Sequence, residues 1–197
     1  MHRLIASGIL LLAAVLSAGC DKPVSAPKFA LTDVTGADFG RQLALTDQNG
    51  QPRTLADFRG KVVVIFFGFT HCPDVCPTAL AELAQVAKDL GKDADRMQVL
   101  FVTVDPERDT PAVLRQYVPA FNPSFLGLYG DAEATARAAK EFKIFYNKQP
   151  LSGGDYSVDH SAGIYVLDKT GRLRLFAQYG RGAPDLLHDI RILLSAP

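Results

Sequence analysis

The sequence predicts an α/β domain in which a central mixed β-sheet is flanked by helices. Two Val- and Ile-rich runs are apolar on both faces, which is typical of central buried strands. Segments with apolar residues at helical spacing follow these runs, and a hairpin pattern precedes the last of them. The length of 197 residues is that of one domain with a tail.

The strands are predicted first from apolar runs and from the turns that separate them. Strands are expected at 43–46, 61–67, 97–104, 164–167 and 173–176. An Asp-Gln-Asn-Gly turn follows the first strand, and an Asp-Lys-Thr-Gly turn joins the last two. The runs at 61–67 and 97–104 are the expected centre of the sheet.

The helices are predicted from apolar spacing and from residues that begin or end helices. They are expected at 80–90, from residue 111, at 132–142 and from residue 184. Gly91 ends the first helix, Thr110 and Asp131 cap the next two, and Pro184 opens the last. The order strand, helix, strand, helix, helix, hairpin and helix implies a central mixed sheet covered by helices, and a thioredoxin-like arrangement is expected.

The composition excludes some classes of function. The chain has 21 Lys and Arg against 21 Asp and Glu, and 48% of its residues are hydrophobic. A nucleic-acid-binding protein would carry a basic excess, so no nucleic-acid partner is expected. Three cysteines are too few for a disulfide framework, and a domain of this size buries a core without one. A monomer is expected.

The first nineteen residues have the pattern of a secretory signal. One Arg precedes a nearly unbroken apolar run, and small residues follow it. The run is shorter than the about 20 residues that span a bilayer, which favours a cleaved signal over an uncleaved anchor. Residues 1–19 are therefore expected to be removed.

Cys20 follows the small residues directly. The run Leu-Ser-Ala-Gly-Cys resembles the end of a bacterial lipoprotein signal, although Ser17 stands where Leu is usual. This resemblance implies lipidation of Cys20, and Asp21 fits retention at the inner membrane. Residues 20–40 are expected to be a tether and 41–197 the folded domain, on the periplasmic side, where disulfides form.

Cys72 and Cys76 concentrate the chemistry. They follow the strand predicted at 61–67 and precede a helix, whose N-terminus favours thiolates. Pro77 disfavours a helical conformation at Cys76, so a turn leading into the helix is expected there. Two buried structural cysteines or a plain disulfide are the alternatives, but a loop this small stabilises little. A redox or metal-binding role is favoured.

The spacing of the pair separates the possible functions. Thioredoxin-like oxidoreductases place two residues between their cysteines, whereas this chain has three. A peroxiredoxin-like pattern would need Thr at position 73 and Pro at position 69, where this chain has Pro73 and Phe69. The peroxidase interpretation is therefore disfavoured.

His160 lies just before the predicted strand at 164–167. In a thioredoxin-like fold the loop before this strand packs beside the cysteine pair, so the imidazole is expected to face two thiolates. Two sulfur ligands and one imidazole suit copper, as Cu(I) or Cu(II). Structural zinc normally takes four protein ligands, and only three can be named here.

Three motifs together resemble the Sco/SenC family. They are Thr-His-Cys-Pro-Asp-Val-Cys-Pro at 70–77, Val-Asp-Pro-Glu-Arg-Asp-Thr-Pro at 104–111 and Val-Asp-His at 158–160. The resemblance covers about residues 35–195. It implies a membrane-tethered, thioredoxin-like copper protein that assists assembly of the binuclear copper centre of cytochrome c oxidase. It also implies that Cys72, Cys76 and His160 are the copper ligands.

Several side chains that neighbour the motifs are further candidates for the site. Asp74 lies between the two cysteines, where it could tune the charge of the site or contact a partner; a solvated loop carboxylate is the alternative. Asp105 and Asp109 end a neighbouring strand and are expected near the site. A helix cap is the alternative role of Asp109. Ligation by His71 is not expected, and His188 is expected at the surface.

The hypothesis is a metallochaperone rather than an enzyme. Oxidation of Cys72 and Cys76 to a disulfide would destroy the site, so metal loading and redox state are expected to be coupled. Its expected partners are the copper-centre subunit of cytochrome c oxidase and other periplasmic copper or thiol-redox proteins. A thiol–disulfide oxidoreductase acting on a copper-receiving protein and a redox or copper sensor remain as alternatives.

Overall fold

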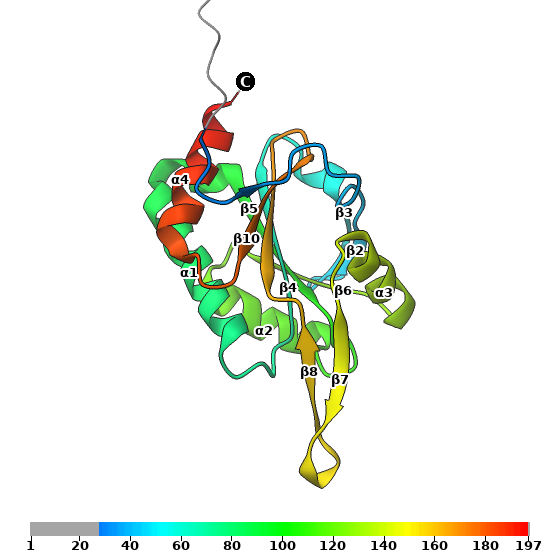
Figure 1. Ribbon diagram of the computed structural model, residues 1–197. Helices are drawn as coiled ribbons and strands as arrows, with labels where there is room; N and C mark the ends of the chain where they lie inside the picture. The colour runs from blue at the N-terminus through cyan, green and yellow to red at the C-terminus, as the bar shows by residue number, and fades with distance from the viewer. Residues whose placement is uncertain (1–27, 197) are drawn as a thin grey trace, which may run out of the picture.

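The computed structural model describes residues 28–196 of the chain (Figure 1). Its main sheet has eight strands in the order β1-β10-β9-β4-β5-β6-β2-β3, and β7 and β8 form a separate two-stranded sheet. The strands are β1 (Thr32–Asp33), β2 (Ala44–Asp47), β3 (Pro52–Thr54), β4 (Val62–Gly68), β5 (Met97–Thr103), β6 (Leu126–Tyr129), β7 (Tyr146–Pro150), β8 (Tyr156–His160), β9 (Gly163–Leu167) and β10 (Leu173–Gln178). The helices are α1 (Val75–Leu90), α2 (Pro111–Phe121), α3 (Ala132–Glu141) and α4 (Gly182–Ser195).

The centre of the sheet is where the two apolar runs predicted it. Strands β4 and β5 pair in parallel from Val62 beside Met97 to Gly68 beside Thr103, and every residue of both strands is buried. Strand β9 pairs antiparallel on the other side of β4, which makes the sheet mixed. Branched and aromatic side chains suit strands that are covered on both faces.

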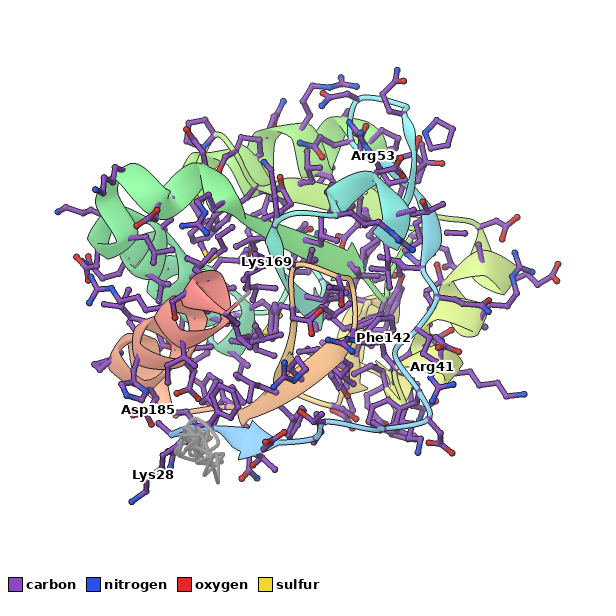
Figure 2. The ribbon with its side chains drawn as sticks, turned by 90° about the horizontal axis from the view of Figure 1, so that it is seen from above. Lys28, Arg41, Arg53, Phe142, Lys169 and Asp185 are labelled. Atoms are coloured by element: carbon purple, nitrogen blue, oxygen red, sulfur yellow. The ribbon has the colours of Figure 1, made fainter. Side chains whose placement is uncertain are left out.

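Helices cover both faces of this sheet. Helices α1 and α4 pack against each other on one side, α2 packs against α1 and β6, and α3 lies on the opposite side near β2 (Figure 1). Seen from above, side chains fill the space between these layers, and the fully buried Phe142 points inward (Figure 2). The predicted thioredoxin-like α/β fold is confirmed.

The predicted helix caps are also confirmed at two positions. The Thr110 and Asp131 side chains accept hydrogen bonds from the N–H groups of Val113 and Ala134.

The prediction of a non-helical turn at Cys76 is wrong, because α1 begins at Val75 and includes Cys76 in its first turn. A proline is tolerated at Pro77, since N–H groups in a first turn have no partner within the helix.

The segment from residue 28 to residue 40 packs on the domain. Strand β1 pairs with β10, and Leu31 is buried. The buried Asp189 carboxylate in α4 accepts hydrogen bonds from the N–H groups of Ala30 and Leu31, at 2.9 and 2.8 Å. The folded unit therefore begins before the predicted boundary at 41.

The predicted signal and Cys20 lie outside the described residues. Within residues 28–196, no helix has the length and apolar character needed to cross a bilayer.

The two ends of the described chain lie far from the end of β4 that leads into α1 (Figure 1). Lys169, in the turn between β9 and β10, donates to the carbonyls of Leu194 and Ala196. The carbonyl of Lys169 accepts the Gly60 N–H at 2.8 Å, just before β4 begins. The C-terminal end of α4 is thus held at the amino end of β4.

Candidate metal centre

The two cysteines lie where β4 ends and α1 begins. Cys72 is half-buried in the connecting loop, whereas Cys76 is fully buried in the first turn of α1. The backbone N–H of Cys76 donates to the Cys72 Sγ at 3.4 Å. The first turn of α1 thus directs a backbone N–H at the Cys72 sulfur.

His160 reaches the cysteines from a different part of the chain, as the last residue of β8. Its Nε2 lies 3.7 Å from the Cys76 Sγ, and its Nδ1 lies 3.1 Å from the Ser161 carbonyl oxygen. Because a carbonyl only accepts hydrogen bonds, Nδ1 carries the proton in the neutral ring. The lone pair of Nε2 is then free and directed toward the sulfur.

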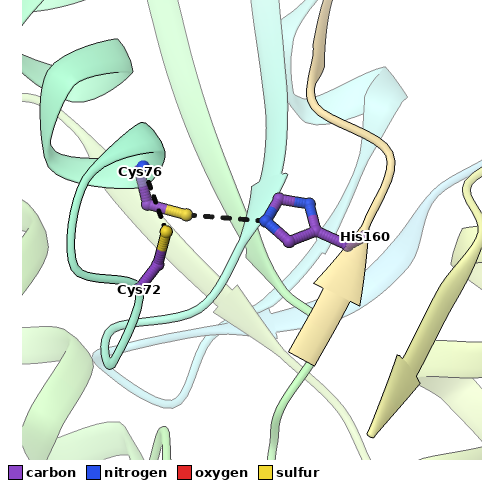
Figure 3. A group of neighbouring side chains, drawn as sticks. All are labelled: Cys72, Cys76 and His160. Atoms are coloured by element: carbon purple, nitrogen blue, oxygen red, sulfur yellow. Dashed lines mark hydrogen bonds between the residues drawn. The ribbon is translucent and has the colours of Figure 1, made fainter. Parts of the chain in front are cut away.

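The three side chains together form a group that can hold a metal ion (Figure 3). The two sulfurs and one ring nitrogen of Cys72, Cys76 and His160 all lie within 4.8 Å of one another. Soft sulfur ligands favour Cu(I), and imidazole suits both oxidation states of copper. Within residues 28–196, this is the one such group of three or more His, Cys, Asp or Glu side chains.

Burial sets the protonation of the buried ligands. Burial raises the pKa of Cys76 above its ordinary value, and the nearby charges of Cys72 and Asp109 raise it further. Burial lowers the pKa of His160, although the Ser161 carbonyl partly opposes this effect. At neutral pH, Cys76 is therefore a thiol and His160 a neutral imidazole, so a metal that binds here must displace the Cys76 proton.

Three residues that the sequence did not single out shape the site. The position that a Cβ of Gly68 would occupy is 2.8 Å from the Cys76 Sγ, so only glycine leaves room for that sulfur. Phe66 and Phe69 pack edge-on against the His160 ring, with centroids 6.4 and 5.8 Å away. A glycine that ends a buried strand just before the cysteine loop was the available signal for Gly68.

Asp109 is close to the cysteine loop but is not part of the ligand group. Its buried carboxylate accepts hydrogen bonds from the Thr70 N–H at 3.0 Å, the Thr70 hydroxyl at 2.5 Å and the Thr103 hydroxyl at 2.6 Å. The alternative role as a helix cap is wrong, because Thr110 caps α2. Burial raises the pKa of Asp109. The residue fixes the start of the cysteine loop to the end of β5.

The remaining candidates divide between the interior and the surface. Asp105 is buried and accepts hydrogen bonds from Arg108 Nε at 2.6 Å and from the Tyr156 hydroxyl at 2.7 Å. Asp74 is exposed and contacts the Thr78 hydroxyl at 3.4 Å, as a loop carboxylate would. Of the other histidines among residues 28–196, both His71 and His188 are exposed, and neither belongs to the ligand group.

The chain is similar to known proteins over most of its length. The family model described as SCO1/SenC matches residues 32–195. The mitochondrial SCO2 homologue of Mus musculus is 42% identical over 156 residues, which are 78% of this chain and 61% of the mouse protein. The chain thus spans about three fifths of the length of this relative.

Solved structures match over nearly their whole length. Bradyrhizobium japonicum ScoI with copper bound is 42% identical, with a TM-score of 0.74 over 79% of this chain and 99% of that one. Apo Sco1 from Thermus thermophilus is 43% identical, with a TM-score of 0.75 over 85% of this chain and 98% of that one.

Proposed function

Because the chain belongs to the SCO1/SenC family, we propose that it is a copper metallochaperone that holds one copper ion through Cys72, Cys76 and His160. The single observation that carries this proposal is the convergence of the three ligand atoms within 4.8 Å, from two segments 84 residues apart. The likeness to a ScoI structure with copper bound supports the choice of metal.

We expect the three ligands to play different parts in the transfer of copper. Two thiolates suffice to hold Cu(I), whereas Cu(II) gains more from a nitrogen ligand. Cys76 is buried and Cys72 is half-exposed, so an incoming ligand from a partner protein meets Cys72 first. Exchange of ligands at the exposed sulfur would move copper without releasing it into water.

The family suggests both the recipient and the location. We propose that the recipient is the copper-centre subunit of cytochrome c oxidase and that the protein acts as a monomer. A lipid on Cys20 would tether it to the periplasmic side of the bacterial inner membrane. The signal-like pattern in residues 1–19 supports this location.

An anaerobic copper titration of the reduced domain, beside its His160→Ala variant, tests the proposal. One tight copper per chain is expected in the wild type, with a Cu(II)–thiolate absorption band that the variant loses. His160→Ala should weaken Cu(II) binding more than Cu(I) binding, because two thiolates can hold Cu(I) linearly. If the wild type bound no copper tightly in either oxidation state while its thiols were intact, the metallochaperone would be rejected. If His160→Ala weakened the binding of both ions equally, the different roles of the ligands would be refuted.

A thiol–disulfide oxidoreductase is the second candidate, and the free, adjacent thiols of Cys72 and Cys76 favour it. The dithiol would give two electrons and two protons to a disulfide of the copper-receiving protein and would become a disulfide itself. This activity needs no metal and no His160. Full cellular function of the His160→Ala variant would favour the oxidoreductase over the metallochaperone.

A further inference from the structure

We propose that Arg108 and Tyr156 clamp the β7–β8 hairpin and thereby hold His160 beside the two cysteines before copper arrives. The proposal rests on the copper site proposed above. The two residues act as positioning residues, since neither belongs to the group of ligand atoms.

The hairpin needs such a device because the main sheet does not hold it. Strands β7 and β8 pair with each other and with no strand of the eight-stranded sheet (Figure 1). A lone two-stranded hairpin is marginally stable in water. His160 ends β8 at the base of the hairpin, opposite Tyr146, whereas Tyr156 begins β8 beside the hairpin turn, opposite Pro150. Contacts that hold the turn end against the domain therefore orient the whole of β8, and the third ligand with it.

The Arg108 side chain makes the central contacts. Its Nη1 donates to the Tyr156 carbonyl oxygen at 2.7 Å and to the Asp155 carboxylate at 3.1 Å. Its Cζ lies 3.7 Å from the centroid of the Tyr156 ring, within the range of a cation–π contact. One guanidinium thus holds the first residue of β8 by its backbone and by its ring.

Asp105 closes this arrangement into a ring of interactions. Its carboxylate accepts hydrogen bonds from Arg108 Nε at 2.6 Å and from the Tyr156 hydroxyl at 2.7 Å. Asp105 is fully buried, and the Arg108 side chain is only 18% exposed. Interactions between charged groups are stronger at such sites than at an open surface, where they are screened.

The other strand of the hairpin reaches the same turn. Lys148, in β7, forms an ion pair with Glu107 at 2.6 Å, and its Nζ lies 4.6 Å from the centroid of the Tyr156 ring. Both partners of this pair are largely exposed, so it adds little by itself. The Arg108 contacts are therefore expected to carry most of the attachment.

The turn that holds the hairpin also holds the cysteine loop. The Asp105 carbonyl accepts the N–H groups of Arg108 and Asp109 at 3.2 and 2.9 Å. Asp109 binds the backbone and hydroxyl of Thr70, two residues before Cys72. A continuous set of contacts thus runs from the cysteine loop through the 105–109 turn to β8, and it fixes both halves of the site relative to each other.

One atom of the clamp is not satisfied. Arg108 Nη2 is buried and has no hydrogen-bond partner among the described residues. A buried donor without a partner carries a desolvation cost, which the other contacts of Arg108 must outweigh. Lysine has neither the fork of donors nor the planar face that stacks on Tyr156, so it cannot replace this arginine.

Tyr156→Phe and Arg108→Lys test the clamp, and Tyr146→Phe is the matched control. Tyr156→Phe removes the hydroxyl bond to Asp105 and leaves the ring. The control removes a hydroxyl from the opposite strand, where it bonds to no described residue. In the copper-free protein, amide hydrogen exchange in β8 is expected to accelerate about tenfold or more in the first two variants and to stay unchanged in the control. Exchange in β4 and β5 reports whether each variant is folded.

Copper binding supplies the second measurement. Tyr156→Phe and Arg108→Lys are expected to weaken Cu(II) binding by about tenfold, the lower end of the range for groups that orient metal ligands. Cu(I) binding should change by less than about threefold, because the thiolates remain in place. Wild-type exchange and wild-type Cu(II) affinity in both variants would overturn the clamp, as would equal weakening of both ions. If the wild type bound no copper, the proposed function would fail, and hydrogen exchange would still decide on the clamp.

Discussion

Replacing Gly68 by alanine tests how tightly the fold seats the Cys76 sulfur. The new Cβ would lie 2.8 Å from the Cys76 Sγ, 2.9 Å from Phe101 Cε2 and 3.1 Å from Phe66 Cε1. To restore a separation of about 3.5 Å, the sulfur would have to move by about 0.7 Å. A binding site keeps its geometry only within about 0.5 Å, so the change is large enough to misplace this ligand.

The same crowding also costs stability. An extra methyl group in a well-packed core destabilises by about 1–3 kcal/mol. For a domain of this size, that loss corresponds to a fall in Tm of about 2–12 °C. Circular dichroism during heating would measure the Tm of the metal-free protein, and competition with a Cu(I) chelator would measure its affinity. We expect the Gly68→Ala variant to lose both stability and about tenfold or more in Cu(I) affinity.

Gly127→Ala separates the two effects. Gly127 is also a buried strand glycine, and a Cβ there would lie 3.0 Å from Val118 Cγ2 and 3.2 Å from Leu114 Cβ. The control is therefore crowded by α2 and not by a ligand, and it should lose stability while its copper affinity stays near that of the wild type. Wild-type Cu(I) affinity in Gly68→Ala would refute the argument that this glycine seats the sulfur.

Two further predictions concern protons and the N-terminal segment. Because burial raises the pKa of Cys76, its thiol stays protonated between pH 6 and 8, and the apparent Cu(I) affinity should rise at least about tenfold per pH unit there. The pKa of His160 is lowered, so above about pH 6.5 protons do not compete with copper for its ring nitrogen. A Cu(I) affinity that stayed constant across pH 6–8 would contradict the argument from Cys76. Asp189→Ala should lower the free energy of unfolding by about 1–3 kcal/mol, because it leaves N–H groups of 30–31 without a charged partner. Urea unfolding would measure this loss, and Asp185→Ala, which breaks only a surface ion pair on the same helix, should cost less than about 1 kcal/mol.

The sequence predicted the centre of the fold well because that centre is determined by local apolar patterns. The runs at 61–67 and 97–104 became β4 and β5 with almost the same bounds. Strands β1, β3 and β6 were not predicted, since strands of two to four residues give little readable alternation. Strand β2 is equally short and was predicted because a strong turn signal follows it. Their position depends on pairing with distant partners rather than on their own residues.

The residues that hold the site together were harder to predict than the three ligands. The cysteine motif and His160 stand out by their residue types. The role of Tyr156 depends on its contacts with Arg108 and Asp105, which lie about 50 residues earlier in the chain. The β7–β8 hairpin is polar and exposed along most of β7, so it lacks the apolar alternation that marks a strand.

The contact of Lys169 with the C-terminal carbonyls has a practical consequence for attaching the protein to a solid support. It holds the end of α4 at the amino end of β4, and the cysteine loop follows the carboxyl end of that strand. The seven residues of β4 separate these ends by about 23 Å. A linker fused after residue 197 would therefore leave Cys72 and His160 facing the solution. Sensor chips coated through that linker would leave the group of Cys72, Cys76 and His160 open to a soluble partner.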